Sequence, residues 1–378
     1  MSTHFDLSPG LLYLNHAGVS PWPRRTVEAV QRFAAENGTR GAADYPRWLE
    51  VERRLREALA QLLGAASPAD IALVKSTSEG LSIVAYGLDW RPGDNVVGIA
   101  QEFPSNRILW QSLAERGVAY RPLDLYAATG PEAGLEALCD GHTRLIAVSS
   151  VQYARGLRLD LERLGAFCRG RGILLGVDAI QSLGALPFDL ARVPADFLAA
   201  DGHKWMLGPE GLAVLYVSPA LRPRLRLHQY GWHMMARAGD YESTDWAPAA
   251  DATRFECGSP NMLGIHGLEA SLSLLLELGL ASVQAAITER VERLIDRIDG
   301  QGFELLSPRE AQRRAGILTF RVPGVDSAAL HRGLIARGVI CAQRGGGVRF
   351  SPHFYTPPEG LDRAVALAAE VASGIAAG

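Results

Sequence analysis

The chain has 378 residues, of which 48% are hydrophobic, so it can bury a large core, and its length predicts two or three domains. Its formal net charge is −3 with both signs mixed throughout, which gives no sign of a nucleic-acid partner or an anionic membrane surface. No apolar run approaches the roughly 18 residues of a membrane span, the start lacks a basic signal-peptide segment, and the four cysteines are widely spaced. Composition therefore argues against a membrane protein, a disulfide framework and a zinc knuckle, and it predicts a protein of the reducing cytoplasm.

The first residues predict an arm followed by two helices. Residues 1–23 are extended and rich in turns, and two prolines near their end oppose a helix. Across residues 26–63 apolar side chains recur every three or four positions, which predicts helix. Glycines within residues 37–41 indicate a turn between two helices.

From residue 70 onward, short apolar runs alternate with helical segments, which predicts a mostly parallel sheet covered on both faces. The expected strands are 71–74, 95–100, 145–148, 173–177, 197–200 and 212–217, and the expected helices are 78–88, 106–116 and 160–171. Only a turn separates the last two strands, which indicates one antiparallel neighbour.

Residues 219–253 break this rhythm and predict a long functional loop that shapes a substrate pocket. Beyond Arg254 the pattern changes to long helices and then to a smaller α+β unit. Its expected elements are helices at 264–280 and 281–298, strands at 317–320 and 348–350, and a last helix at 362–376. We therefore place a domain boundary near Arg254.

Of the 38 basic residues, only Lys75 and Lys204 are lysines. Arginine serves wherever only a positive charge is needed, but it cannot lose its proton near neutral pH and act as an amine nucleophile. Lys204 lies in a turn bounded by Gly202 and Gly208, directly after an apolar strand. It is therefore a candidate Schiff-base lysine, with an ordinary surface lysine at a strand end as the alternative.

Other polar residues follow predicted strands at the same sheet edge, where ligands of open α/β sheets bind. Ser76, Thr77 and Ser78 open a helix, where hydroxyl and free N–H groups suit a phosphate, although an ordinary helix cap is the alternative. Asp178 ends the strand 173–177 and could cap a helix or hold a pyridinium proton near Lys204. The hydroxyl-rich helix start, the strand-end Asp178 and Lys204 are far less expected to occur together by chance than any one of them alone.

Three segments carry a family resemblance: Val177-Asp178-Ala179-Ile180-Gln181, Asp201-Gly202-His203-Lys204 with Gly208-Pro209, and Arg254-Phe255-Glu256-Cys257-Gly258-Ser259-Pro260-Asn261. Their order and spacing resemble class V (cysteine-desulfurase-like) enzymes of fold-type I, which use pyridoxal 5′-phosphate (PLP). The resemblance runs from Leu14 to Arg349 and is specific to the superfamily, not to one reaction. It implies an α/β fold in three parts: residues 1–23 as an arm lining the site, 24–254 as a PLP-binding large domain with a mostly parallel sheet, and 255–378 as a small α+β C-terminal domain.

The resemblance implies roles for residues around the cofactor ring. Lys204 would form the Schiff base and later shuttle the α-proton, and Asp178 would pair with the pyridine nitrogen. Gln181 would reach the 3′-oxygen. Phe103, or the residue beside it, would stack on the ring.

The resemblance also implies roles at the phosphate and the substrate. Thr77, Ser78 and His203 would bind the phosphate, and Ser259 would reach across a homodimer interface to the partner's cofactor. Arg349 would hold the substrate α-carboxylate through a bidentate pair. In the arm, His16 either lines the substrate site or is an ordinary loop histidine.

Two departures from the family pattern bear on the reaction. Asp201 stands where desulfurases usually have a serine, and an anion there would repel a phosphate unless it is protonated or turned away. Desulfurases carry their catalytic cysteine on a sizeable loop before the arginine that matches Arg349, whereas here only a short Gly-rich link follows Arg344. Cys341 lies in an apolar run, which is typical of a buried small hydrophobic residue.

We therefore predict a PLP-dependent, class V aminotransferase-like enzyme acting on a small amino-acid substrate, with transamination as the leading reaction because the desulfurase loop is missing. A C–S lyase, cysteine desulfurase or epimerase on the same scaffold is the nearest alternative. A nucleotide-binding or scaffold module without catalysis is the alternative of another class, although no G-x-G-x-x-G follows the first strand. The histidines show no metal-ligand spacing, so no metal is expected. The expected state is a cytoplasmic homodimer with shared sites and no nucleic-acid or membrane partner.

Overall fold

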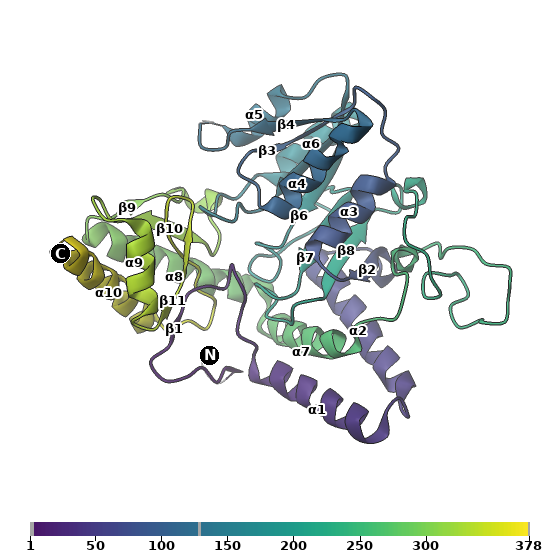
Figure 1. The fold of residues 1–378 in the computed structure, drawn as a ribbon, viewed down its shortest axis with the longest axis horizontal. Helices are drawn as coiled ribbons and strands as arrows, with labels where there is room; N and C mark the ends of the chain where they lie inside the picture. The colour runs from purple at the N-terminus through teal and green to yellow at the C-terminus, as the bar shows by residue number, and fades with distance from the viewer. Residues whose placement is uncertain (1–3, 128–129, 377–378) are drawn as a thin grey trace.

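A seven-stranded sheet forms the centre of the larger part of the chain (Figure 1). In the computed structural model, which describes residues 4–127 and 130–376, the strand order is β2-β8-β7-β6-β5-β3-β4. The strands are β2 (Ile71–Val74), β3 (Asn95–Ile99), β4 (Ala119–Leu123), β5 (Thr143–Ser149), β6 (Leu174–Asp178), β7 (Phe197–Asp201) and β8 (Ala213–Val217). The strands from β7 to β4 are parallel, whereas β8 is antiparallel to both of its neighbours. The predicted antiparallel pair after the lysine turn is confirmed.

Helices cover both faces of this sheet, because its strands are apolar on both sides. The covering helices are α3 (Thr77–Gly87) and α4 (Pro104–Ser112) on one face, and α2 (Tyr45–Leu63), α6 (Leu161–Arg171) and α7 (Met262–Leu278) on the other. Val84 and Trp110 are buried on the first face, and Leu55 and Leu164 on the second. The remaining helices of this part are α1 (Arg24–Arg40) and α5 (Pro131–Ala137).

The C-terminal part has its own antiparallel sheet, in the order β12-β13-β10-β9. Its elements are α8 (Leu280–Gly300), β9 (Glu304–Leu305), β10 (Leu318–Arg321), α9 (Ser327–Ile335), β11 (Val339–Ile340), β12 (Ala342–Arg344), β13 (Gly347–Phe350) and α10 (Pro358–Ala376). Figure 1 shows these elements gathered at the left of the molecule, beside the part that holds the large sheet. The α+β character of this part agrees with the prediction.

The N-terminal arm joins the two parts. Its strand β1 (Leu12–Tyr13) pairs in parallel with β11 of the small domain. A few residues later the backbone N–H of Ser20 donates to the carbonyl of His203 at 2.8 Å, and the side chain of Gln181 donates to the carbonyl of Ala17 at 3.1 Å. The arm is therefore tied to both domains at the place where they meet.

Helix α7 belongs by its contacts to the large domain. It packs on α1 and α2, where Arg25 pairs with Glu277 at 2.8 Å. Its Ser271 hydroxyl also donates to the carbonyl of Leu207 at 2.8 Å. This packing favours a boundary at Gly279 in place of the proposed one at Arg254.

Among the described residues no single helix is long and apolar enough to cross a membrane. Helices α7 and α8 reach that length and apolar character only as a pair, and they meet at an angle of 84°.

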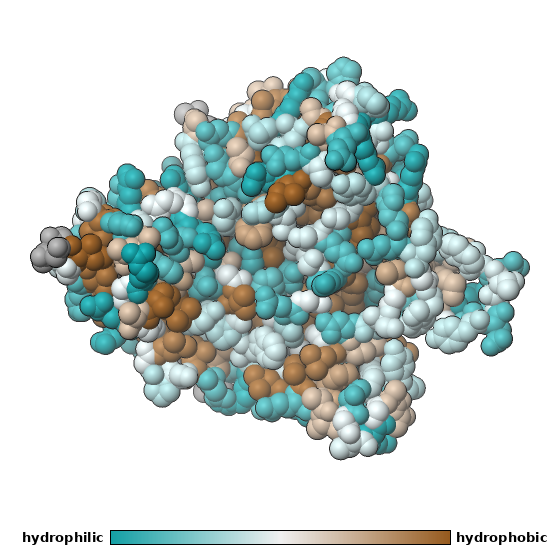
Figure 2. Space-filling model, in the orientation of Figure 1, coloured by the Kyte–Doolittle hydropathy of each residue, from teal (hydrophilic) through white to brown (hydrophobic). Residues whose placement is uncertain are grey.

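The predicted long loop is irregular over most of its length and projects from the large domain at the right of Figure 1. Tyr230, Tyr241 and Trp246 on this loop are 62%, 69% and 56% exposed. Elsewhere on the face drawn in Figure 2, apolar side chains form separate patches among polar ones. The loop thus holds several aromatic rings in solvent, away from the cores of both domains.

Candidate active site

The turn between β7 and β8 holds Lys204 on a rigid frame. Backbone hydrogen bonds join Gly202 to the carbonyl of Leu212 at 2.9 Å, Gly208 to the carbonyl of Gly202 at 2.8 Å, and Leu207 to the carbonyl of Lys204 at 3.0 Å. Leu207 has φ of 62°, a left-handed conformation that costs a non-glycine residue roughly 1 kcal/mol or more. The surrounding hydrogen bonds hold this strained residue in place, so the backbone at Lys204 is fixed.

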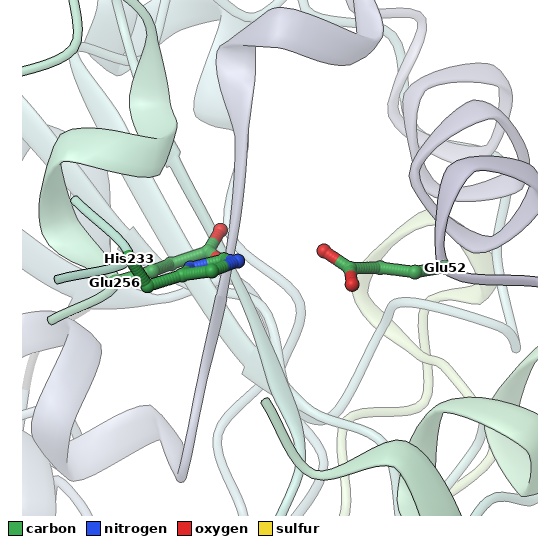
Figure 3. A group of neighbouring side chains, drawn as sticks. All are labelled: Glu52, His233 and Glu256. Carbon is green, nitrogen blue, oxygen red and sulfur yellow. The ribbon is translucent and has the colours of Figure 1, made fainter. Parts of the chain in front are cut away.

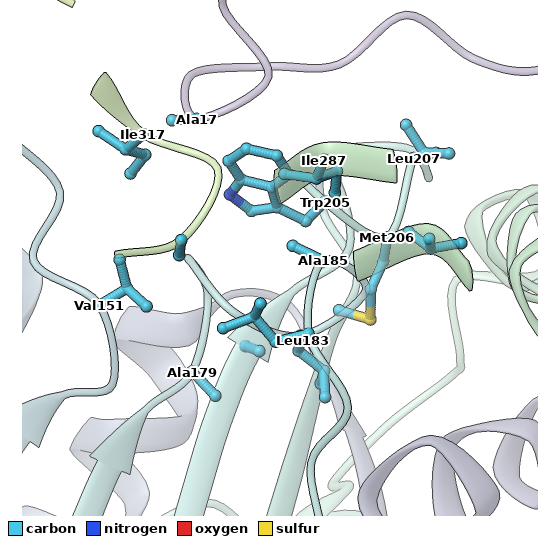
Figure 4. Packing of buried hydrophobic residues seen from close by; sticks show 14 of the residues in the cluster. Ala17, Val151, Ala179, Leu183, Ala185, Trp205, Met206, Leu207, Ile287 and Ile317 are labelled. Carbon is cyan, nitrogen blue, oxygen red and sulfur yellow. The ribbon is translucent and has the colours of Figure 1, made fainter. Parts of the chain in front are cut away.

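The residues after Lys204 anchor the turn in the core. Figure 4 shows Trp205 beside Ile287 and Ile317 of the C-terminal part, with Ala17 of the arm nearby. Trp205 is completely buried. A Cβ at Gly316 would lie 2.2 Å from the Trp205 ring, so the small domain packs tightly on the indole. The arm and both domains therefore meet around Trp205, the residue that follows Lys204.

A cavity of about 360 Å³ opens above this turn. All the predicted site residues except His16 and Ser259 line it. These are Thr77, Ser78, Phe103, Asp178, Gln181, His203, Lys204 and Arg349. The cavity is large enough for a cofactor and a small substrate.

Lys204 and Asp178 are buried and have shifted pKa values. Burial lowers the pKa of Lys204 to about 8; the charge of Asp178 opposes this shift, and the charges of Arg349 and Arg344 add to it. Burial raises the pKa of Asp178 to about 6, although a hydrogen bond from the Ile180 N–H and the charge of Lys204 oppose the shift. The cavity thus contains an amine that loses its proton near neutral pH beside a buried carboxylate.

The start of α3 has more hydroxyl groups than a helix cap requires. The Ser76 hydroxyl is the cap, because it accepts from the N–H of Glu79 at 3.2 Å. The Thr77 hydroxyl accepts from the N–H of Asp201 at 2.9 Å, so its own proton is free to be donated. The Ser78 hydroxyl donates to Ser105 Oγ at 2.8 Å. The Thr77 hydroxyl therefore keeps a free proton at a positive helix end that lines the cavity, with the Ser78 hydroxyl beside it.

Asp201 lies against His203. Its carboxylate oxygen Oδ1 is 2.9 Å from Nδ1 of the imidazole, although the two atoms are not aligned for a hydrogen bond. This contact places the carboxylate against the imidazole ring. The anion that the sequence left unexplained is thus turned toward His203.

The amide of Gln181 has a defined orientation. The indole N–H of Trp205 donates to Gln181 Oε1 at 2.9 Å, and Gln181 Nε2 donates to the carbonyl of Ala17 at 3.1 Å. An indole N–H can only donate and a carbonyl can only accept, so the amide cannot be reversed. One N–H of Nε2 remains for a ligand oxygen in the cavity.

Arg349 is a buried cation with an unused donor. Its side chain is 3% exposed, Nη1 donates to the carbonyl of Tyr153 at 2.7 Å, and Nη2 donates to Asn15 Oδ1 at 3.1 Å. Among the residues that the structure describes, its Nε has no hydrogen-bond partner. Burial lowers the pKa of Arg349 to about 10, which still leaves it charged at neutral pH. A buried guanidinium that keeps one N–H unused at a cavity wall is suited to an anionic ligand.

Phe103 lies at the mouth of the cavity. Its ring is 40% exposed and forms an edge contact with Tyr153 at 5.3 Å between centroids. The Lys204 amine lies 5.4 Å from the centroid of the Phe103 ring. The ring is therefore placed to cover a planar group held at Lys204.

His16 does not line the cavity, and the expectation that it contacts substrate there needs correction. The residue is completely buried, with Nδ1 at 2.8 Å from the carbonyl of Ser351 and Nε2 at 2.6 Å from the Tyr355 hydroxyl. Burial lowers its pKa to about 4, so the ring is neutral and satisfied within the core. The next arm residues, 17–19, line the cavity instead.

Ser259 lines a different cavity, together with Lys75, Glu79 and Asn261. It does not reach Lys204 within one chain, and its role at a partner's site stays a prediction. Tyr153 and Arg344 are among the cavity residues that were not predicted as site residues. In the sequence Arg344 is recognisable only as the residue that begins the Gly-rich link. Whether its side chain points toward the cavity depends on the strand register, which the sequence does not show.

A second polar cluster joins Glu52, His233 and Glu256, whose candidate ligand atoms all lie within 4.8 Å of one another (Figure 3). Arg56 pairs with Glu256 at 2.6 Å and with Glu52 at 2.5 Å, so a positive charge already bridges the two carboxylates. Glu256 also accepts from the N–H of Leu73 in β2 at 2.8 Å. These contacts explain the cluster as a buried ion-pair network that fastens α2 to the sheet edge.

Known proteins match nearly the whole chain. The family model for aminotransferase class-V matches residues 12–363. A probable cysteine desulfurase from Methanothermobacter thermautotrophicus is 30% identical over 372 residues, covering 92% of this chain and 91% of the relative. Isopenicillin N epimerase from Streptomyces clavuligerus is 30% identical over 386 residues, covering 94% of each chain.

Solved structures of the cystine C–S lyase C-DES are similar over the same span. Its complex with the reaction product cysteine persulfide has a TM-score of 0.89 and 26% identity, covering 96% of this chain and 98% of that chain. A C-DES mutant with glycine covalently linked to the PLP cofactor has a TM-score of 0.88 and 26% identity, covering 96% of this chain and 97% of that chain.

Proposed function

Since this chain belongs to the aminotransferase class-V family, whose enzymes use PLP, we propose that it transfers the amino group of an amino-acid substrate to a keto-acid acceptor at the Lys204 cavity. The family and the cofactor predicted from the sequence are thereby confirmed. The observation that favours this choice over a desulfurase is the hairpin beside Arg349, which joins β12 to β13 through two residues and carries no cysteine loop. Transfer of the amino group remains our proposal.

The cavity residues fit PLP by the chemistry of their donors. The Thr77 and Ser78 hydroxyls and the N–H groups at the start of α3 would hold the phosphate, with His203 beside them. Asp178 would face the ring nitrogen and Gln181 the ring oxygen, through its one free N–H. Lys204 is the only lysine that lines the cavity, so it would be the point of covalent attachment.

When bound, PLP draws electrons from the substrate α-carbon and makes its hydrogen acidic. The Asp178 carboxylate would hold a proton at the ring nitrogen, which strengthens that effect. Once the substrate amino group has displaced it from the cofactor, the Lys204 amine, with its pKa lowered to about 8 by burial, would be free to take and hold the proton from the α-carbon. Arg349 would fix the α-carboxylate and so orient the hydrogen toward the amine.

The hairpin between β12 and β13 opposes a desulfurase mechanism. Arg344 pairs directly with Gly347, and only Gly345 and Gly346 lie between them, with φ of 60° and 88°. Positive φ at both central residues is the mark of a tight two-residue turn. Cys341 is 4% exposed and burial raises its pKa to about 12, so it stays a buried thiol.

Plain C–S elimination is the second candidate, and the similarity to a C–S lyase over 96% of the chain favours it. Elimination, epimerisation and amino transfer share the removal of the α-proton, for which the same Lys204 and Asp178 serve. They differ in where the next proton or leaving group goes. A spectral titration with a panel of amino acids, followed by assays for keto acid, sulfide and the D-amino acid, separates them; sulfide or D-amino acid without stoichiometric amino transfer would reject our first choice.

We further propose a homodimer with shared sites. Ser259 lines a separate surface cavity of one chain, and the loop beside it exposes Tyr230 and Trp246. Two equivalent contacts across a twofold axis would bring each Ser259 to the partner's phosphate site. Light scattering of the active enzyme tests this, and a fully active monomer would contradict it.

A further inference from the structure

Arg344 and Arg349 lie on one face of the β12–β13 hairpin. The cross-strand pairs are Ala342 with Arg349 and Arg344 with Gly347. Directly opposed residues of antiparallel strands point to the same face, and so do residues two apart on one strand. The two arginines are therefore diagonal neighbours, and their directly opposed partners are the two smallest side-chain types. Both arginines line the Lys204 cavity.

The backbone under Arg344 is held firmly. The tight turn at Gly345 and Gly346 ends the hairpin, and the Arg155 side chain donates to the carbonyl of Gly345 at 2.9 Å. A Cβ at Gly345 would lie 3.0 Å from the Arg155 side chain, so that the turn is packed as well as bonded. Arg344 thus extends from a fixed strand end and not from a loose loop.

The two guanidinium groups differ in depth. Arg349 is buried and held by Tyr153 and Asn15, whereas Arg344 is exposed and makes one hydrogen bond, from Nη1 to the carbonyl of Gln343 at 2.8 Å. Within residues 4–127 and 130–376 no carboxylate lies within 4.0 Å of either guanidinium. Arg344 is close enough for its charge to lower the pKa of both Lys204 and Arg349. The cavity wall therefore offers one cation inside and a second at the mouth.

We propose that the substrate is an amino acid with a second acidic group on its side chain, and that Arg344 is the residue that recognises this group. The proposal rests on the amino-acid chemistry proposed above. A substrate anchored by its α-carboxylate at Arg349 has its α-carbon at Lys204 and directs its side chain along the hairpin face to Arg344.

The test uses equilibrium binding of unreactive acids to the PLP-loaded enzyme, followed by the change in cofactor absorbance. The dicarboxylates succinate and glutarate are compared with the monocarboxylates propionate and butyrate. A charge-assisted hydrogen bond predicts that the better dicarboxylate binds about tenfold or more tightly than its monocarboxylate partner. Arg344→Gln should abolish this preference, because it weakens binding of the dicarboxylate more than binding of butyrate.

Arg337→Gln is the matched control, because Arg337 is an exposed arginine of the same domain outside the cavity. It should leave both affinities unchanged, which separates a specific contact from loss of net charge. Arg349→Gln should weaken both kinds of acid alike. Equal binding of mono- and dicarboxylates by the wild type, or equal effects of Arg344→Gln and Arg337→Gln, would overturn the proposal.

This binding experiment, combined with the keto-acid assay on amino acids, separates this inference from the proposed reaction. If the enzyme releases keto acid only from neutral amino acids and shows no preference for dicarboxylates, the proposed reaction is supported and the acidic substrate is rejected. If the enzyme prefers glutarate through Arg344 but yields no keto acid from any amino acid, the role of Arg344 in binding a second acidic group is supported and amino transfer is rejected.

Discussion

The floor and the hairpin wall of the cavity are built in different ways. The floor consists of strand ends and helix starts of the parallel sheet, where Lys204 and Asp178 are buried and fixed by backbone hydrogen bonds. The wall is a hairpin of the small domain that carries Arg344 and Arg349 and closes with two glycines. In the mechanism we propose, the floor supplies groups for proton transfer and the wall supplies cations for recognition. The proposal thus assigns reaction chemistry to one domain and substrate choice to the other.

Removing the floor's amine should have the largest effect. Lys204→Ala should abolish turnover, and it should also abolish the covalent attachment of PLP that borohydride makes permanent. The arginines of the cavity, Arg344 and Arg349, cannot replace the lysine amine as a nucleophile. Peptide mapping of the borohydride-treated protein is the measurement. Cofactor fixed at Lys75 in this variant would show that the assignment is wrong.

Asp178→Asn should reduce turnover by roughly 100-fold or more, which is typical when a group stabilising developing charge is removed. The amide lacks the negative charge that holds a proton at the ring nitrogen. PLP should still bind, since Lys204 and the α3 hydroxyls remain. Steady-state kinetics and cofactor content are measured together; wild-type turnover would contradict the role of Asp178.

The lowered pKa of Lys204 predicts a pH dependence for attachment of PLP to cofactor-free protein. Below a pKa of about 8 the protonated amine is unreactive, so the attachment rate should rise about tenfold per pH unit and level off above pH 8. The charge of Asp178 raises this pKa, so Asp178→Asn should move the midpoint to lower pH. A midpoint near 10.5, the ordinary value for lysine, would contradict a buried amine.

Trp205→Phe should weaken PLP binding by several-fold, the smallest of these effects. Phenylalanine keeps most of the buried ring but removes the N–H that fixes the Gln181 amide. Trp110→Phe is the control, because Trp110 is equally buried and loses a similar 2.8 Å bond to Asn106 away from the cavity. PLP affinities measured by fluorescence should differ between the two variants; equal losses would show that Trp205 acts only through packing.

The same division explains what the sequence could predict. Strands such as β3 and β7 are short apolar runs buried on both faces, so their pattern was clear. The edge strand β4 is partly exposed and contains Pro122, and it lacked this signal. The floor residues follow directly from strand ends, which is why Asp178 and Lys204 were found.

The wall depends on information that a single sequence does not show. Arg344 shares a face with Arg349 only because the turn contains two residues, and a change of one residue would point it to the other face. His16 was ambiguous because a buried, satisfied histidine and a site histidine look alike in sequence. The α7 packing that favours a boundary at Gly279 depends on tertiary contacts with α1 and α2.

The central claim is that Lys204, on the floor of the cavity, removes a proton from the substrate α-carbon, and that the hairpin wall provides no cysteine that can accept sulfur. The most direct measurement is a single turnover of the PLP-loaded enzyme with cysteine, in the wild type and in Cys341→Ala, followed by mass spectrometry of the intact protein. We predict no persulfide on any cysteine, and product yields that agree within a few-fold between the two proteins. A persulfide on Cys341 together with loss of activity in Cys341→Ala would contradict the account and identify a desulfurase.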